Sequence, residues 1–166
     1  MTYCIDTSSL ITVQRAYRLS IFPSLWTHLT NMANSGRLLA PSEVYRELEA
    51  GSDDEIFKWA KRHKFIFRDL DSEQFELAQR IINDPKYRDS FDLDKETPEA
   101  DPFVIALAIV EQRSIRLFSN QIMVVSDENQ ATPGKKPKIP NICADPNYRV
   151  GCIHILDMFD REGCQF

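Results

Sequence analysis

The chain has 166 residues, a length that predicts one domain, over residues 1–166, with a sizeable core. Its 43% hydrophobic and 27% charged residues are typical of a globular protein, and no apolar run nears the roughly 20 residues that span a bilayer. The net charge of −5 argues against nucleic-acid binding through bulk positive charge, but it leaves open a nuclease whose clustered acids hold a metal.

Without a signal-peptide pattern, the chain is expected to be cytoplasmic and to have no contact with a membrane. The four cysteines form no C-x-x-C pair, which argues against a zinc ribbon and for reduced thiols. Both observations favour an intracellular protein over a secreted, disulfide-bonded one.

Short apolar segments alternate with helical ones along the first half of the chain. The expected strands are residues 3–5, 37–41 and 65–70. The expected helices are residues 10–19, 24–36, 43–50, 52–64 and 72–84. "DTSS" after the first strand and Ser42 after the second supply capping groups, and Gly36 and Gly51 stand where helices end.

The second half continues the alternation with longer polar connections. Residues 85–101 are polar and predict a loop, whereas 102–113 predict a buried apolar helix. A buried strand is expected at 122–126 and a proline-rich loop at 130–141, and 150–159 closes the chain as a strand or short helix.

This order of elements predicts an α/β protein: a three-layer sandwich with a central, mostly parallel sheet. In such sheets, ligand sites gather outside the carboxyl ends of the strands. Asp6 follows the first strand there, and the Asp127–Glu128 pair follows the strand at 122–126. Two separate strands are therefore expected to bring acids to the same edge.

Acidic residues recur at strand ends and at the starts of helices. The candidates are Asp6, Glu43 or Glu47, Asp101, and Asp127 or Glu128. Glu43 and Glu47 are four residues apart, so they share one face of a helix. Carboxylates gathered in one pocket repel one another unless some are protonated or a hard cation neutralises them. Mg²⁺ and Mn²⁺ prefer such oxygen ligands, so the set indicates a divalent metal site.

Each acid also has a plain structural interpretation. Asp6 and Asp101 stand at positions where an aspartate caps a helix, and Pro102 after Asp101 is a normal helix start. Glu43 or Glu47 alone would be a solvated charge on a helix. Their recurrence in the order of an α/β chain favours one shared site over several unrelated roles.

The same residues resemble the four motifs of PIN domains, in order. "YCIDTSSLI" is an apolar strand followed by Asp and small hydroxyl residues, and "PSEVYREL" is a helix with Glu before Leu. "EADPFVIALAI" is Ala–Asp before an apolar helix, and "VVSDEN" is an apolar strand, Ser, one residue and an acid. The motifs span residues 3 to 129, and the resemblance is closest to the branch associated with toxin–antitoxin pairs.

The resemblance implies a fold and a set of catalytic residues. Carried over motif by motif, the catalytic residues are Asp6, Glu47, Asp101 and Glu128. Asp6, Asp101 and Glu128 are the implied ligands of Mg²⁺ or Mn²⁺. The fourth position is more often Asp in the family, so it stays open whether Glu128 supports both metal sites and full activity.

Further residues are secondary candidates. Ser8 matches a family hydroxyl position that helps to orient the first Asp, and Glu43 and Asp127 are neighbours that could substitute for the main acids. A lysine-rich loop is a candidate RNA contact through its phosphates, with a solvated loop as the alternative. Its residues are Lys135, Lys136 and Lys138.

The family resemblance implies an endoribonuclease that hydrolyses RNA phosphodiesters with a metal-activated water. It further implies a toxin with an RNA substrate and a cognate antitoxin protein as partners, and it leaves a homodimer open. The alternative is a PIN-like module that has lost catalysis and acts through protein or RNA contacts. An aspartyl phosphatase fits less well, because position 8 is Ser8 rather than a second acid, and no G-x-G-x-x-G indicates a dinucleotide site.

Overall fold

The computed structural model describes residues 1–51, 54–92, 99–115 and 121–164. Within these ranges, five strands form one sheet in the order β3-β2-β1-β4-β5, and all neighbouring strands run parallel. The strands are β1 (Thr2–Ile5), β2 (Leu38–Pro41), β3 (Phe67–Arg68), β4 (Ile122–Val125) and β5 (Gly151–Ile153).

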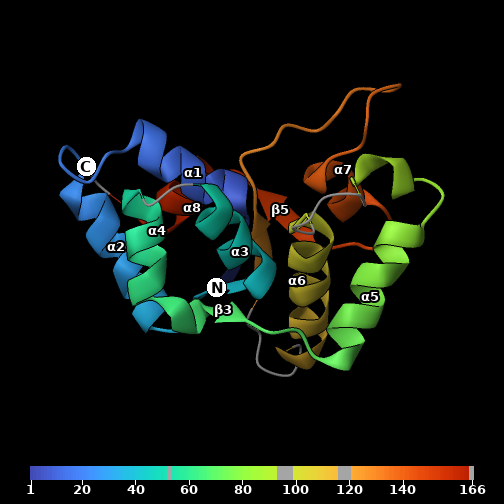
Figure 1. Cartoon of the computed structure of the whole chain (residues 1–166), viewed down its shortest axis with the longest axis horizontal. Coiled ribbons are helices and arrows are strands. Elements are labelled where there is room, and N and C mark those ends of the chain that lie inside the picture. Colours follow the sequence, from blue (N-terminus) through green and yellow to red (C-terminus); the bar gives the residue numbers. More distant parts are fainter. Residues whose placement is uncertain (52–53, 93–98, 116–120, 165–166) are drawn as a thin grey trace.

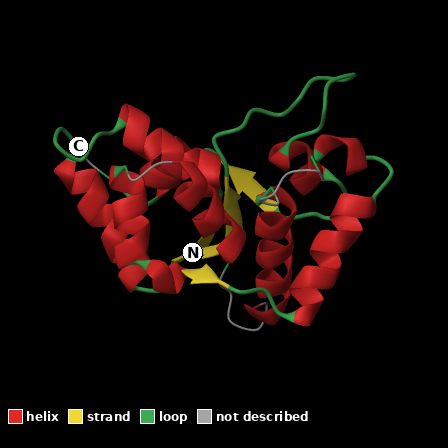
Figure 2. Ribbon diagram, in the orientation of Figure 1, coloured by secondary structure: helices red, strands yellow, loops and turns green. Residues whose placement is uncertain are grey.

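Helices cover both faces of this sheet, as a parallel sheet requires. They are α1 (Thr7–Ala16), α2 (Pro23–Asn34), α3 (Ser42–Gly51), α4 (Glu55–Arg62), α5 (Ser72–Asn83), α6 (Asp101–Ile115), α7 (Ile139–Ala144) and α8 (Ile155–Arg161). Figure 1 shows α1 to α4 and α8 on one side of the sheet and α5, α6 and α7 on the other. Figure 2 shows the strands as a narrow band between these two groups of helices, so the predicted α/β sandwich is confirmed.

The register of the central strands positions the acidic edge. β1 lies between β2 and β4, with Ile5 paired to Val125. The backbone N–H of Asp6 donates to the carbonyl of Val125 at 2.9 Å, which carries the pairing one residue past the strand. Asp6 and Ser126 are thereby brought side by side at the carboxyl ends of β1 and β4.

The helix α6 is the apolar element of the second layer. Its residues 103–110 are all buried, and it packs between the sheet and α5. A helix that is apolar on every side is stable in water only when it is covered all round. Asp101 is the first residue of α6, so it stands at the end of a rigid element.

Several boundaries differ from the sequence-based ones. α1 begins at Thr7 rather than near residue 10, because Asp6 caps it and accepts from the N–H groups of Thr7 and Ser8. The strand expected at 65–70 is reduced to the two residues of β3, preceded by the short helical turn Lys64–Ile66. The expected start of the helix at 52–64 includes Ser52 and Asp53, which lie outside the described residues.

Two segments near the end of the chain were only partly predicted. The loop expected at 130–141 contains the start of α7, with Pro140 in its first turn, where proline is favoured. Residues 150–159, expected as a strand or a short helix, form both β5 and most of α8. Over the described ranges, no helix has the length and apolar character needed to span a bilayer.

Candidate metal centre

Asp6 is the buried centre of the candidate site, with 2% of its surface exposed. Its carboxylate accepts from the N–H of Thr7 at 2.6 Å, the hydroxyl of Ser8 at 2.6 Å and the hydroxyl of Ser126 at 3.3 Å. Burial raises the pKa of Asp6 to about 6, opposed by the hydrogen bond from Ser8 and supported by the charges of Glu47 and Glu128. The carboxylate is thus held in one orientation while its charge is disfavoured.

Glu47 links the second motif to the first and the third. It comes from α3, which follows β2, and its Oε2 accepts a hydrogen bond from the hydroxyl of Thr7. Its Oε1 accepts from the backbone N–H of Ala100, the residue before α6, at 2.9 Å. Glu47 therefore fixes the start of α6 against the start of α1.

Asp101 begins α6 and shares the field of the other acids. Burial raises the pKa of Asp101 well above its usual value, and the charges of Asp6, Glu128, Glu47 and Glu99 raise it further, in that order. Of these charges, that of Asp6 has the largest effect on the pKa of Asp101. The first and third motifs therefore lie close enough for the charge of Asp6 to act on Asp101.

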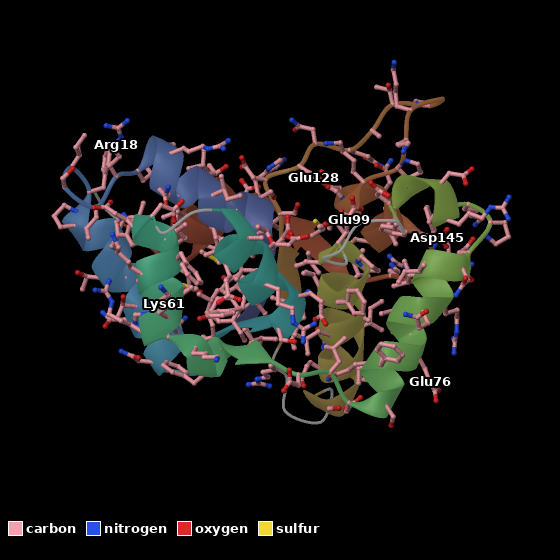
Figure 3. All side chains as sticks on the ribbon, viewed as in Figure 1. Arg18, Lys61, Glu76, Glu99, Glu128 and Asp145 are labelled. Atoms are coloured by element: carbon pink, nitrogen blue, oxygen red, sulfur yellow. The ribbon has the colours of Figure 1, made fainter. Side chains whose placement is uncertain are left out.

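Glu128 lies beside this group but is held by other partners. The Nζ of Lys138 lies 3.0 Å from its Oε1, and the N–H of Ile139 donates to its Oε2 at 3.3 Å. Glu128 thus binds the first turn of α7, while its charge still acts on Asp6 and Asp101. Figure 3 shows Glu99 and Glu128 near the end of α6 at which that helix begins.

The secondary candidates divide between the site and its surroundings. Ser8 touches Asp6 directly, and its hydroxyl also accepts from the N–H of Asp127 at 3.1 Å. The carboxylate of Asp127 turns elsewhere, accepting from Thr12 at 2.7 Å and facing Nδ1 of His154 at 3.8 Å. Glu43 pairs with Arg46, its neighbour on α3.

The lysine-rich segment forms a loop that projects from the sheet edge between β4 and α7 (Figure 1). Lys135 and Lys136 are exposed, whereas Lys138 is engaged with Glu128. The first two are therefore the ones free to reach a phosphate in solution.

The sequence predicted the supporting role of Ser8 but not the corresponding roles of Thr7 and Ser126. Thr7 bonds to Glu47, and Ser126 bonds to Asp6, so each joins two motifs. The signal was available, since "DTSS" and "VVSDEN" set a hydroxyl residue next to an acid after each strand.

The donor set can be tested for its fit to a divalent metal. Among the described residues, no three His, Cys, Asp or Glu side chains stand together so as to hold an ion as they are. Mg²⁺ seldom needs such a cage, because it keeps several waters and takes one or two carboxylates together with substrate phosphate oxygens. Asp6 and Asp101 supply two carboxylates whose repulsion a cation relieves, so the residues present fit Mg²⁺ or Mn²⁺.

Comparison with known proteins identifies a family but adds no activity. A family model described as "Domain of unknown function (DUF4411)" matches residues 3–166. No curated protein and no solved structure matches the chain. The site itself is therefore the ground for any statement about function.

Proposed function

The chain belongs to the DUF4411 family of unknown function, and from that premise we propose that it is a metal-dependent endoribonuclease built on a PIN-like parallel α/β fold. The observation that carries the proposal is the gathering of Asp6, Glu47, Asp101 and Glu128 at the carboxyl edge of the sheet, where the charge of Asp6 raises the pKa of Asp101 and the charges of Glu47 and Glu128 raise the pKa of Asp6. A hard divalent cation held by Asp6 and Asp101 would offset this crowding of negative charge.

The residues around the proposed metal have separate tasks. Asp6 and Asp101 would hold Mg²⁺ or Mn²⁺, and Glu128, which follows β4 and contacts the first turn of α7, would act on it through its charge. Ser8 and Ser126 orient Asp6 through their hydroxyl groups, so that its carboxylate keeps one geometry. Glu47 keeps the two halves of the site together through Thr7 and Ala100.

The metal, when bound, supplies a Lewis acid that activates water and stabilises the charge that develops on a phosphodiester. The chain itself contributes position: its two carboxylates stand at the ends of rigid elements and would hold the ion together with water and phosphate oxygens. No Ser, Thr or Cys nucleophile is needed for such a hydrolysis. The substrate is an RNA strand, as the resemblance to PIN domains implies.

One observation favours a second candidate function, a PIN-like module without catalysis. Glu128 is occupied by Lys138 and Ile139, so the fourth acid is held away from a metal by bonds within the chain. A chain that binds RNA or protein but does not cleave it would tolerate this arrangement. The same measurement of cleavage separates the two functions.

The partners remain part of the proposal. A toxin of this kind would be neutralised by a cognate antitoxin protein, and it would act on RNA inside the cell that makes it. A direct check is whether production of the chain arrests growth and whether Asp6→Asn relieves that arrest.

The decisive experiment is cleavage of a labelled single-stranded RNA with Mn²⁺, Mg²⁺ or EDTA. We expect cleavage with either metal, none with EDTA, and a loss of at least about 100-fold in Asp6→Asn and in Asp101→Asn, because each removes a charged ligand. Asp89→Asn is the matched control, since the Asp89 side chain is 91% exposed and lies outside the site.

A second readout does not depend on activity. Mn²⁺ should raise the Tm of the wild-type protein, and it should leave the Tm of Asp101→Asn nearly unchanged. Metal-dependent stabilisation without cleavage would support the inactive module, whereas cleavage that survives both substitutions would refute the proposed site.

A further inference from the structure

A groove opens next to the candidate metal centre, between α3, α5 and the start of α6. Its volume is about 450 Å³. The residues that shape it are Glu43, Arg46, Phe75, Gln79, Phe91 and Phe103. Its full lining combines three aromatic rings with three carboxylates, one guanidinium and two amides, a mixture of flat apolar and polar surface that suits a flat, polar-edged ligand.

The groove adjoins the proposed catalytic acids through the chain itself. Glu43 lies one turn before Glu47 on α3, and Pro102, which also lines the groove, directly follows Asp101. Glu99, a further lining residue, acts on the pKa of Asp101. A ligand in the groove is therefore a direct neighbour of a phosphate bound at Asp6 and Asp101.

The aromatic face of the groove is open to solvent. Phe75 is 51% exposed, and its ring centroid lies 6.5 Å from that of Phe103. Phe91 is buried beneath the groove. An exposed ring backed by buried rings is a platform for stacking, and stacked bases are the common means by which proteins hold single-stranded RNA.

The polar edge of the groove carries an unsatisfied acceptor. The Glu43 side chain is only 12% exposed, and its Oε2 atom is buried and accepts no hydrogen bond from the described residues. The other oxygen, Oε1, lies 3.4 Å from Nη1 of Arg46. A buried carboxylate oxygen without a donor is costly, so a ligand whose N–H groups draw the Glu43 carboxylate toward the groove would relieve that cost.

We propose that this groove is a base-binding subsite that holds a guanine of the RNA substrate. The guanine ring stacks on Phe75, and its Watson–Crick edge donates from N1–H and the 2-amino group to Glu43. Arg46, beside that carboxylate, donates to O6. The subsite rests on the proposed function, because it names the base next to the phosphate that is cut.

The donor pattern of the groove selects guanine among the four bases. Guanine alone presents two adjacent N–H donors on its Watson–Crick edge. Uracil offers one donor between two carbonyl oxygens, and one of those oxygens would face the carboxylate. Adenine and cytosine each present one amino donor beside a bare ring nitrogen, and the lone pair of that nitrogen would repel the Glu43 carboxylate. A buried acceptor left unpaired by the wrong base is the usual source of such discrimination.

The test measures nucleotide binding in EDTA, where cleavage plays no part. GMP, AMP, CMP and UMP are titrated into ¹⁵N-labelled protein, and Kd values follow from the amide shifts. GMP should bind about tenfold more tightly than the other three, with shifts in α3 and α5. Glu43→Gln should remove this preference, and Phe75→Ala should weaken all four nucleotides by about tenfold.

Two control variants separate these effects from general damage. Glu49→Gln changes an exposed acid on the same helix α3, and Phe65→Ala removes a ring that is 60% exposed outside the groove. Both should bind GMP as the wild type does.

The outcomes distinguish this proposal from the proposed function. Equal affinity for the four nucleotides, a guanine preference that persists in Glu43→Gln, or no saturable shift with GMP at about 10 mM overturns the subsite. Metal-dependent cleavage could still be present in each of those cases. Guanine binding that depends on Glu43 in a chain that cuts no RNA would support the subsite and refute the nuclease.

Discussion

Asp6 and Asp101 are held very differently, although both belong to the candidate site. Asp6 is surrounded by donors from Thr7, Ser8 and Ser126. The carboxylate of Asp101 gains no hydrogen bond from the described residues and meets the charges of Asp6, Glu128 and Glu47. Of these two acids, Asp101 is therefore the one whose charge costs the fold more.

The first prediction concerns this cost. In EDTA at pH 7.5, Asp101→Asn should stabilise the protein by about 1 kcal/mol and raise its Tm by about 2–4 °C, because one repelling charge is removed. Thermal unfolding measures the change, with Asp89→Asn as a neutral surface control. A lower Tm in Asp101→Asn would contradict the repulsion.

Some residue roles could be read from the sequence and others could not. Ser8 beside Asp6 was expected from the first motif, and the two do bond. The bond between Thr7 and Glu47 joins α1 to α3, so it depends on how those helices pack. Glu128 was expected as a catalytic residue and metal ligand, but its contacts with Lys138 and Ile139 were not, because those two residues lay in a segment that was expected to be a loop.

At the scale of elements, two tyrosines join the end of α5 to the end of α7. The hydroxyl of Tyr87 donates to Asp145 at 2.6 Å, and that of Tyr148 donates to Asp84 at 2.8 Å. Lys86 adds an ion pair to Asp145 at 3.0 Å. This reciprocal pair holds α7, and with it the contact to Glu128, against the helices of the second layer.

The second prediction is a pH dependence that follows from this pair. The hydrogen bonds from Tyr87, the N–H of Asn147 and Lys86 lower the pKa of Asp145 to about 2. A lowered pKa means that the ionised form stabilises the fold above the unfolded value of about 4, and that this stability is lost as the pH falls toward 2. Tyr87→Phe should cost about 1–2 kcal/mol at pH 7 and clearly less at pH 3.

Urea unfolding at the two pH values measures this difference. Asp145→Asn and the double variant complete a cycle that isolates the pair from other effects of each substitution. An equal cost of Tyr87→Phe at pH 7 and pH 3 would exclude the ionised Asp145 as its partner.

The third prediction concerns the contact between β4 and β5. A Cβ atom at Gly151 would lie 2.7 Å from Cε of Met123, closer than packed atoms tolerate. Gly151→Ala should therefore destabilise the protein by about 1–2 kcal/mol, since a flexible side chain must move aside. Chemical denaturation should show that Met123→Val, which shortens that side chain, offsets most of the loss. A cost that Met123→Val leaves unchanged would place the strain in the backbone.

Elements with strong periodicity were predictable, and those shaped by their surroundings were not. α2, α5 and α6 match the expected ranges closely because apolar faces or continuous apolar character define them. β3 is short because only Phe67 and Arg68 pair with β2. The extent of this pairing depends on the position of β2 in the sheet, which the alternating pattern of "FIFRDL" does not encode. α7 was missed because three prolines and a glycine dominate residues 130–141, although Pro140 fits a first turn.

At the scale of the whole molecule, a net charge of −5 must be reconciled with the proposed polyanionic substrate. The net charge gives no long-range attraction to RNA, so the proposed substrate would have to be held by local contacts. Lys135 and Lys136 project on the loop beside the site, and both are exposed. They are the candidates for a local electrostatic contribution.

The fourth prediction measures that contribution. The double variant Lys135→Gln, Lys136→Gln should weaken RNA binding and reduce the slope of log Kd against log salt by about 1.4, since each lysine neutralises one phosphate of a single strand. Fluorescence anisotropy in EDTA between about 50 and 200 mM salt gives the slope. Lys58→Gln, an exposed position on α4, is a control on another surface, and an unchanged slope in the double variant would remove the loop from the interface.

The sheet topology was predictable from the sequence only in part. Alternating strands and helices were sufficient to predict the layers and the parallel sheet, because a parallel pair needs a crossover. The order 3-2-1-4-5 needed the pairing of β1 with both β2 and β4, which local patterns do not encode. Family motifs supplied the order of the acids but not the side-chain partners that hold them.

The central position of β1 has a consequence for protein synthesis. Its neighbour β4 is made some 120 residues later, so a ribosome needs on the order of ten seconds to supply it. Until then Asp6 has neither Ser126 nor Asp101 nearby, and a nascent chain on its polysome carries no assembled pocket. If the chain is the proposed ribonuclease, such a delay would spare the messenger RNA that is being translated, and it would leave an interval in which another protein could bind the unfinished chain.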